Sequence, residues 1–155
     1  MKEIKNFISS EESNELIQFH KKNFNLNNEH CFMHRNTAVM DHLMVTKFTN
    51  IEKALTKFVK NINNNYVINY FQIVKWPTGE SQDPHLDFDY HPYTSIIYLN
   101  DDFEGGETVV LDKTIVPEKN KLISFEGDRI LHKVNEITKG IRYTVPCWYK
   151  YESKS

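Results

Sequence analysis

Apolar residues recur with a helical period in two early segments of the chain, and a strand-like pattern follows them. Ser9 and Glu12 form an S-x-x-E capping pattern ahead of spaced apolar residues, which predicts a helix over about residues 10–22. Asn50 is positioned to cap a second helix, in which the apolar residues from Ile51 to Ile62 form one stripe. The first third of the chain is therefore expected to be largely helical.

The segments around these helices carry weaker signals. Residues 2–7 are expected to form a short strand or a lead-in to the first helix. Residues 24–46 are rich in asparagine and show no clear period, so strand fragments and a mobile loop fit them equally well. Within this stretch, residues 28–46 are interpreted as a long surface loop, with a flexible substrate lid as the functional alternative.

From Tyr66 onward, short runs of β-branched and aromatic residues alternate with turn residues such as Gly105-Gly106. The predicted strands are residues 66–74, 94–100, 108–111, 121–125, 130–134 and 142–149. Two helices followed by about eight strands indicate an α+β fold. The regular spacing of the short strands suits an antiparallel sandwich or an open barrel.

The composition bounds the possible partners. With 155 residues, of which 39% are apolar and 26% charged, the chain is the size of one globular domain. The formal net charge of −2 gives no attraction toward nucleic acid or an anionic membrane, and no apolar run reaches the roughly 18 residues of a membrane span. Cys31 and Cys147 follow no metal or redox spacing, so we expect reduced thiols in a cytoplasmic protein.

One short segment, His85-Leu86-Asp87, offers ligands for a metal ion. Residues two apart on an extended strand point to the same face, so this imidazole and this carboxylate can bind one ion. His132, on a later predicted strand, is the best candidate for a third ligand. Two histidines and one carboxylate leave three coordination positions free, which suits a non-haem Fe(II) oxygenase, although a zinc hydrolase uses the same ligand types. Asp89 and His91 would share the face of Asp87 on a longer strand and compete for the assignment.

Arg142 follows His132 by ten residues and lies on another predicted strand. If both strands line one barrel, the guanidinium reaches the cavity beside the metal and can bind a carboxylate bidentately. An arginine on the surface of a strand is the plain alternative. Iron with three free positions and a carboxylate anchor is what a 2-oxo acid cosubstrate requires, whereas a cupin-like module that only holds a metal needs no anchor.

These features resemble the Fe(II)/2-oxoglutarate-dependent oxygenases, in particular their prolyl 4-hydroxylase-like branch, over about residues 70–149. The motifs that carry the resemblance occur in the family's order. They are His85-x-Asp87, Tyr98-Leu99-Asn100, Gly105-Gly106-Glu107-Thr108, His132-Lys133-Val134, Gly140-x-Arg142-Tyr143 and Trp148. Each motif is weak alone, and their combination makes chance agreement improbable.

The resemblance implies a double-stranded β-helix (jelly-roll, cupin-like) core of about eight mainly antiparallel strands, with two N-terminal helices packed on one sheet. It implies one oxygenase domain over residues 1–155, with residues 1–65 as helical support and 66–150 as the core. The iron would be bound by His85, Asp87 and His132.

The resemblance also assigns the cosubstrate. It implies that 2-oxoglutarate chelates the iron by its keto and C1 carboxylate oxygens and places its distal carboxylate on Arg142. Thr108 and Tyr98 match positions whose hydroxyls help to hold that carboxylate, and Trp148 matches an aromatic residue of the pocket wall. Trp76 stands where relatives often carry a tyrosine, and its indole can donate a hydrogen bond but not accept one.

The implied activity is a dioxygenase that consumes O2 and 2-oxoglutarate and releases succinate and CO2, with ascorbate as a candidate reductant. The predicted substrate is a prolyl residue in a protein or peptide, and a free amino acid or small molecule is the alternative. The nucleic-acid demethylases of the superfamily usually carry a second arginine where this chain has Trp148, so no nucleic-acid substrate is expected. We expect a monomer or weak dimer with no membrane partner.

Overall fold

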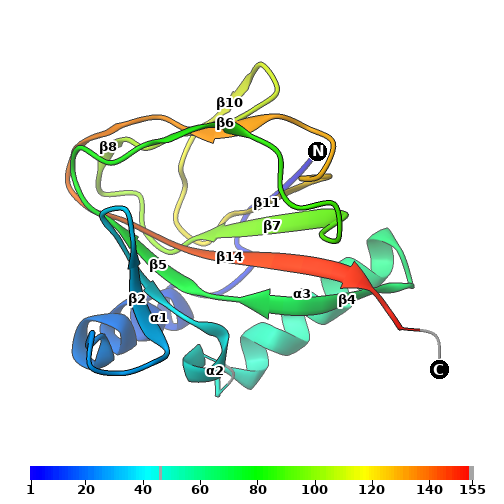
Figure 1. The fold of residues 1–155 in the computed structure, drawn as a ribbon, viewed down its shortest axis with the longest axis horizontal. Helices are drawn as coiled ribbons and strands as arrows, with labels where there is room; N and C mark the ends of the chain where they lie inside the picture. The colour runs from blue at the N-terminus through cyan, green and yellow to red at the C-terminus, as the bar shows by residue number, and fades with distance from the viewer. Residues whose placement is uncertain (46, 154–155) are drawn as a thin grey trace.

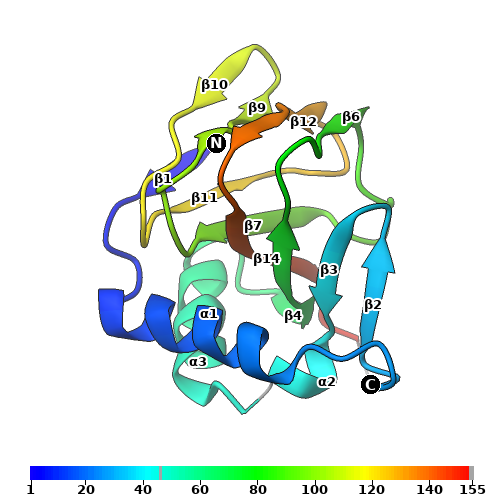
Figure 2. The ribbon, with the colours of Figure 1, turned by 90° about the vertical axis from the view of Figure 1, so that its left-hand side faces the viewer.

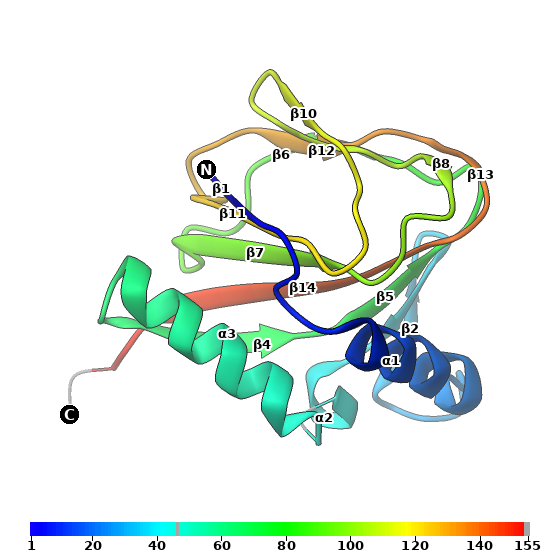
Figure 3. The ribbon, with the colours of Figure 1, turned by 180° about the vertical axis from the view of Figure 1, so that it is seen from behind.

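Two long helices pack on one face of the larger of the two facing β-sheets (Figures 1 and 3). The computed structural model describes residues 1–45 and 47–153, so residue 46 of the segment 28–46 and the last two residues of the range 1–155 lie outside the description. The helices are α1 (Ser10–Asn23), the short α2 (His42–Val45) and α3 (Thr49–Ile62). None of these described helices is long and apolar enough to cross a membrane.

The two long helices begin in different ways. The predicted capping box of α1 is confirmed, because the Ser9 hydroxyl accepts the Glu12 N–H at 3.1 Å and the Ser9 N–H donates to Glu12 Oε1 at 3.0 Å. The predicted cap of α3 is wrong: Asn50 lies inside the helix, and Phe48 is the N-cap without any side-chain bond. Phe48 packs instead edge-on against Phe19 of α1, with ring centroids 5.2 Å apart. Tertiary packing of its apolar face therefore fixes the start of α3.

The larger sheet has eight strands. In spatial order they are β1 (Lys2–Ile4), β11 (Leu122–Phe125), β7 (Tyr93–Tyr98), β14 (Arg142–Tyr151), β5 (Ile73–Trp76), β3 (Thr37–Met40) and β2 (Cys31–His34), and β4 (Tyr66–Phe71) also pairs with β14. The smaller sheet faces it and contains β10 (Lys113–Ile115), β9 (Thr108–Val110), β12 (His132–Val134) and β6 (Gln82–His85) (Figure 2). A two-stranded ribbon of β13 (Ile137–Lys139) and β8 (Glu104–Gly105) joins them at one end. Every pairing is antiparallel, which confirms the predicted α+β class with facing antiparallel sheets.

The long strand predicted over residues 66–74 is divided into β4 and β5, and its partner β14 supplies the reason. Gln72, between the two strands, donates its N–H to the carbonyl of Pro146 at 3.1 Å. Pro146 has no N–H to return the second bond of that pair, so the ladder is interrupted at this point. The proline lies in the middle of the sheet, because β7 flanks β14 on its other side.

Residues 24–46, which the sequence left open, contain a β-hairpin. β2 pairs with β3 from Cys31 opposite Met40 to His34 opposite Thr37, and β3 then joins β5. Buried His20 of α1 lies against this hairpin, with its Nε2 3.0 Å from the Ala38 carbonyl. Residues 2–4 pair with β11, so the opening segment is a strand. The larger sheet therefore gains an edge that the apolar pattern did not reveal.

Candidate active site

The three predicted metal ligands converge between the two sheets. β6 and β12 are neighbours in the smaller sheet, and their register places His85 directly opposite His132. Asp87 lies two residues past the end of β6. Its Oδ1 is 3.2 Å from Nε2 of His132 and 3.7 Å from Nε2 of His85, and one ligand atom from each residue lies within 4.8 Å of the others.

The structure corrects the reason given for the position of Asp87. The strand ends at His85, so the two side chains do not share a strand face. Asp87 is turned inward by its own N–H, which donates to the Gly127 carbonyl at 2.8 Å, and by the Thr94 hydroxyl, which donates to Oδ2 at 2.6 Å. A Cβ on Gly127 would lie 2.2 Å from that Oδ2, so only glycine allows this close approach. Neither Thr94 nor Gly127 was identified from the sequence, because Gly127 is distant along the chain and Thr94 approaches Asp87 only through the fold of the loop between them.

Both histidines turn Nε2 toward Asp87 and engage Nδ1 with a backbone carbonyl. Nδ1 of His85 lies 2.9 Å from the Asp83 carbonyl, and Nδ1 of His132 lies 2.8 Å from the Ile130 carbonyl. A carbonyl accepts only from a protonated nitrogen, so each neutral ring keeps a lone pair on Nε2. A carbonyl that accepts from the nitrogen facing away from the metal is typical of metal-ligating histidines, because it fixes both the tautomer and the orientation of the ring.

The carboxylate is electrostatically prepared for a cation. Burial by itself would raise the pKa of Asp87, but the side-chain contacts with His132 and Thr94, together with the electrostatic effect of the two imidazoles, lower its pKa below the usual value. Two neutral imidazoles and one ionised carboxylate fit Fe(II) with open coordination positions, and the same set also accepts zinc. Among the described residues, no other group of three such side chains converges in this way.

The rival ligands lie apart from this cluster. Asp89 is exposed on the loop that follows Asp87. His91 is buried, and its Nε2 is paired with the Asn69 side chain at 2.8 Å. Both residues belong to the loop that follows Asp87, and neither is part of the cluster of candidate ligands.

Arg142 reaches the same space through the alternation of β14. Along this strand, Arg142, Thr144, Pro146 and Trp148 line the cavity, while the residues between them pack in the helix-covered core. Arg142 is 1% exposed, and its Nε donates to the Gly106 carbonyl at 2.9 Å. Its buried position excludes the plain alternative of a surface arginine.

The surroundings of Arg142 contain hydroxyls and aromatic rings but no anion. Its Nη2 donates to the Thr108 hydroxyl at 3.0 Å, and that hydroxyl is 2.5 Å from the Tyr98 hydroxyl. The guanidinium carbon lies 4.9 Å from the centre of the Trp76 ring. Among the described residues, no carboxylate lies within 4.0 Å of its nitrogens. Burial lowers the pKa of Arg142, but a guanidinium remains protonated, so the chain presents a buried cation without a counter-charge.

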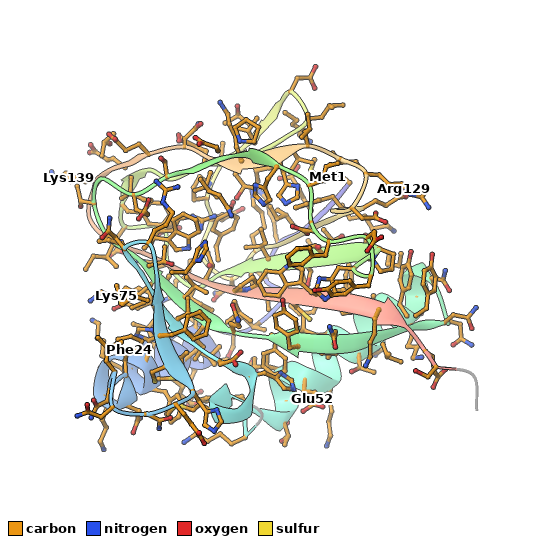
Figure 4. The ribbon with its side chains drawn as sticks, in the orientation of Figure 1. Met1, Phe24, Glu52, Lys75, Arg129 and Lys139 are labelled. Atoms are coloured by element: carbon orange, nitrogen blue, oxygen red, sulfur yellow. The ribbon has the colours of Figure 1, made fainter. Side chains whose placement is uncertain are left out.

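A cavity of about 500 Å³ joins the two groups of residues. It is lined by all three candidate ligands and by Arg142, Thr108, Trp76 and Trp148, whereas Tyr98 reaches it only through Thr108. Side chains of both sheets point into the space between them (Figure 4). The β2–β3 hairpin supplies a further wall with Phe32, His34, Thr37 and Val39, a contribution that the weak pattern of residues 24–46 did not predict.

Comparison with known proteins adds a family and a fold. The model of the 2OG-Fe(II) oxygenase superfamily matches residues 71–150. Human prolyl 3-hydroxylase 2 is 36% identical over 70 residues, covering 40% of this chain and 10% of that protein. Prolyl 3-hydroxylase 3 of Mus musculus is 28% identical over 82 residues, covering 48% of this chain and 11% of its length. The chain thus spans about a tenth of the length of these curated relatives.

Two solved structures share the fold along nearly the whole chain. The viral collagen prolyl hydroxylase of Paramecium bursaria Chlorella virus-1, in its 2OG complex, has a TM-score of 0.71 at 21% identity, covering 98% of this chain and 96% of its own. A Trichoplax adhaerens prolyl hydroxylase, in complex with a hypoxia inducible factor oxygen degradation domain peptide fragment, has a TM-score of 0.76 at 20% identity. The match covers 97% of this chain and 83% of the Trichoplax chain. These likenesses confirm the predicted jelly-roll fold.

Proposed function

Because the chain belongs to the 2OG-Fe(II) oxygenase superfamily, we propose that it hydroxylates a prolyl residue in a protein or peptide. The family uses Fe(II), 2-oxoglutarate and O2. Each turnover would insert one oxygen atom of O2 into a C–H bond of the substrate. The other oxygen atom would enter succinate as 2-oxoglutarate loses CO2.

The observation that carries this proposal is the buried, unneutralised guanidinium of Arg142. An uncompensated charge in a buried site is costly, so it is retained where a ligand supplies the opposite charge. We assign this role to the distal carboxylate of 2-oxoglutarate, with the hydroxyls of Thr108 and Tyr98 as supporting partners. A module that only stores a metal has no use for such an anchor beside the metal ligands.

His85, Asp87 and His132 are assigned as the residues that would hold the iron. Bound Fe(II) would supply the activation of O2 for decarboxylation and hydroxylation. The chain would contribute orientation and exclusion of water: two Nδ1–carbonyl bonds fix the imidazoles, and Thr94 fixes the carboxylate. Trp76 packs against the anchor and Trp148 forms part of the cavity wall, so both are assigned as pocket residues.

The substrate assignment rests on the relatives and on the cavity wall. The relatives and neighbours described above are named as prolyl hydroxylases, and one of them holds a peptide. Aromatic side chains, including Tyr70 and Trp148 with ring centroids 4.8 Å apart, line the cavity and suit an apolar pyrrolidine ring. The sequence relatives are named as 3-hydroxylases, whereas a solved structure of similar fold, from Pseudomonas putida, is named as a prolyl-4-hydroxylase (TM-score 0.71, 14% identity, covering 98% of this chain and 92% of its own). We therefore propose proline as the target residue without assigning the ring carbon that is hydroxylated.

The cytoplasmic location and the monomeric or weakly dimeric state stay predictions. Both cysteines, Cys31 and Cys147, are free and buried, which supports a reducing compartment. The state of assembly can be measured by sedimentation.

The proposal is tested with a panel of proline-containing peptides and free L-proline. The protein is supplied with Fe(II), 2-oxoglutarate and O2, with and without ascorbate. Mass spectrometry should detect the gain of one oxygen atom on a peptide proline, and succinate should form in equal amount. Oxidation of free proline alone would favour the small-molecule alternative. Protein that binds metal but forms no succinate with any substrate would support the non-catalytic module.

A further inference from the structure

His91 is a buried polar group of the cavity wall that the assigned chemistry leaves unused. It follows the loop after Asp87, and its backbone N–H donates to the Phe88 carbonyl at 2.9 Å. The residue is 1% exposed and lines the cavity that contains the candidate ligands. Its Nε2 is 2.8 Å from the Asn69 side-chain nitrogen, and its Nδ1 has no partner among the described residues.

The hydrogen bond from Asn69 determines which nitrogen of His91 carries the proton. An amide nitrogen donates, so Nε2 must accept and the proton of the neutral ring lies on Nδ1. Burial lowers the pKa of His91, with a smaller opposing effect from Asp87, which favours the neutral ring. The ring therefore offers an unused N–H donor at the cavity wall.

The neighbours of His91 are aromatic. The ring centroids of Tyr70, Trp148 and Tyr90 lie 5.5, 6.3 and 4.5 Å from that of the imidazole. Phe88 and Tyr90 stack on each other with centroids 5.3 Å apart and are 66% and 58% exposed. The donor thus lies within an apolar wall that opens to solvent, so a ligand there should combine apolar groups with a hydrogen-bond acceptor.

We propose that His91 is a substrate-binding residue whose Nδ1–H donates to a backbone carbonyl oxygen of the substrate peptide. This inference rests on the proposed prolyl hydroxylation and adds a contact that would orient the peptide across the cavity mouth. A peptide carbonyl next to the target proline provides the acceptor, and the proline ring and its neighbours provide the apolar surface. The exposed Phe88–Tyr90 pair would accommodate the chain where it leaves the cavity.

The tautomer can be measured without any substrate. In the 155-residue chain with ¹⁵N-labelled histidine, loaded with diamagnetic Zn(II), two-bond ¹H–¹⁵N spectra distinguish a protonated Nδ1 from a protonated Nε2. The resonances of His91 are assigned by their loss in His91→Phe. We expect the Nδ1–H form. An Nε2–H form would mean that His91 donates to Asn69 and has no donor left for a substrate, which would overturn the inference.

Two conservative variants separate substrate binding from a purely structural role. The amide nitrogen of asparagine reaches about as far as Nδ1 of histidine and can donate like it, whereas the amide oxygen of glutamine reaches about as far as Nε2 and can accept from Asn69. We expect His91→Gln, which keeps the Asn69 contact, to raise the KM for the best peptide of the panel about tenfold, as loss of one hydrogen bond implies. His91→Asn should raise it clearly less. The reverse order would show that pairing with Asn69 is what matters.

The two hypotheses fail in different ways. Absence of turnover of every peptide by the unaltered protein would refute the proposed function, and the tautomer would still decide whether His91 offers a donor. Normal turnover of a peptide together with equal KM values for the unaltered protein and both variants would refute only the role of His91.

Discussion

Replacing Thr94 by valine removes one hydrogen bond from Asp87 and leaves the outline of the side chain almost unchanged. The Thr94 hydroxyl donates to Asp87 Oδ2 at 2.6 Å, on the side of the carboxylate away from the contacts of Oδ1 with the two histidines. Thr94 is 3% exposed and the Asp87 side chain 8% exposed, so water has little access to replace the lost donor. The variant therefore tests whether a carboxylate oriented by the chain is part of a metal site.

The magnitude follows from the charge of the acceptor. A hydrogen bond to a charged group contributes about 1.5–3 kcal/mol, and about 1.4 kcal/mol corresponds to a factor of ten. Loss of a second-shell partner typically lowers metal affinity about 10- to 100-fold, which agrees with that range. The same hydroxyl helps to lower the pKa of Asp87, so its removal should raise that pKa. As pH is lowered, Asp87 of Thr94→Val should therefore become protonated, and metal binding should be lost, at a higher pH than in the unaltered protein.

The assay is calorimetric titration with Mn(II), which does not oxidise as Fe(II) does. Thr144→Val is the matched control, because Thr144 is 2% exposed and lines the same cavity without bonding to any candidate ligand. Thr94→Ser should retain most of the affinity. Tight binding of Mn(II) by Thr94→Val, or equal losses in Thr94→Val and Thr144→Val, would refute the reasoning.

Three further substitutions test other parts of the account. Arg142→Leu should weaken 2-oxoglutarate binding by about 2–5 kcal/mol, at least about thirtyfold. Arg142→Lys should be intermediate, because lysine keeps the charge but lacks the planar fork of the guanidinium. Titration of the Mn(II)-loaded protein with 2-oxoglutarate measures both variants, and retained affinity in Arg142→Leu would reject Arg142 as the anchor. Gly127→Ala should lower Mn(II) affinity at least about tenfold, because the new Cβ would lie 2.2 Å from Asp87 Oδ2, and affinity equal to that of the unaltered protein would contradict this packing. Burial lowers the pKa of His20 in the folded chain, so as pH falls below about 6.5 the unfolded chain binds a proton before the folded chain does. The free energy of unfolding should therefore fall by at most about 1.4 kcal/mol per pH unit as the pH is lowered. Urea unfolding between about pH 7 and 5.5 should show a smaller fall for His20→Gln, and an unchanged slope would argue against a buried neutral histidine.

Local signals predicted the elements whose structure is fixed locally. The Ser9 capping box and the apolar spacing after it gave the start of α1, and β-branched runs gave most strands of the larger sheet but only β9 and β12 of the smaller one. The predicted cap of α3 was wrong: Phe48, which packs on Phe19, is the N-cap, and Asn50 lies inside the helix. Propensity cannot weigh a contact between two helices distant in sequence.

In the candidate site, too, the sequence predicted which residues take part but not the contacts that orient them. Residue types and their order along the chain identified the candidate ligands and Arg142. The geometry that orients Asp87 depends on Gly127 and Thr94, which approach it only in the folded chain. The hairpin of residues 31–40 that walls the cavity was not predicted, since its β2 strand lies at the sheet edge with an almost fully exposed pattern. A strand is recognised in a sequence by alternating apolar and polar residues, and a strand that is exposed over most of its length need not show that alternation.

The most direct test of the central claim is anaerobic addition of Fe(II) and 2-oxoglutarate to the protein, followed by visible absorption. Chelation of iron by the cosubstrate at the proposed site should produce the weak metal-to-ligand charge-transfer band of this family, and His132→Ala should abolish it. Protein that demonstrably holds iron and is saturated with 2-oxoglutarate, yet shows no band, would contradict the account.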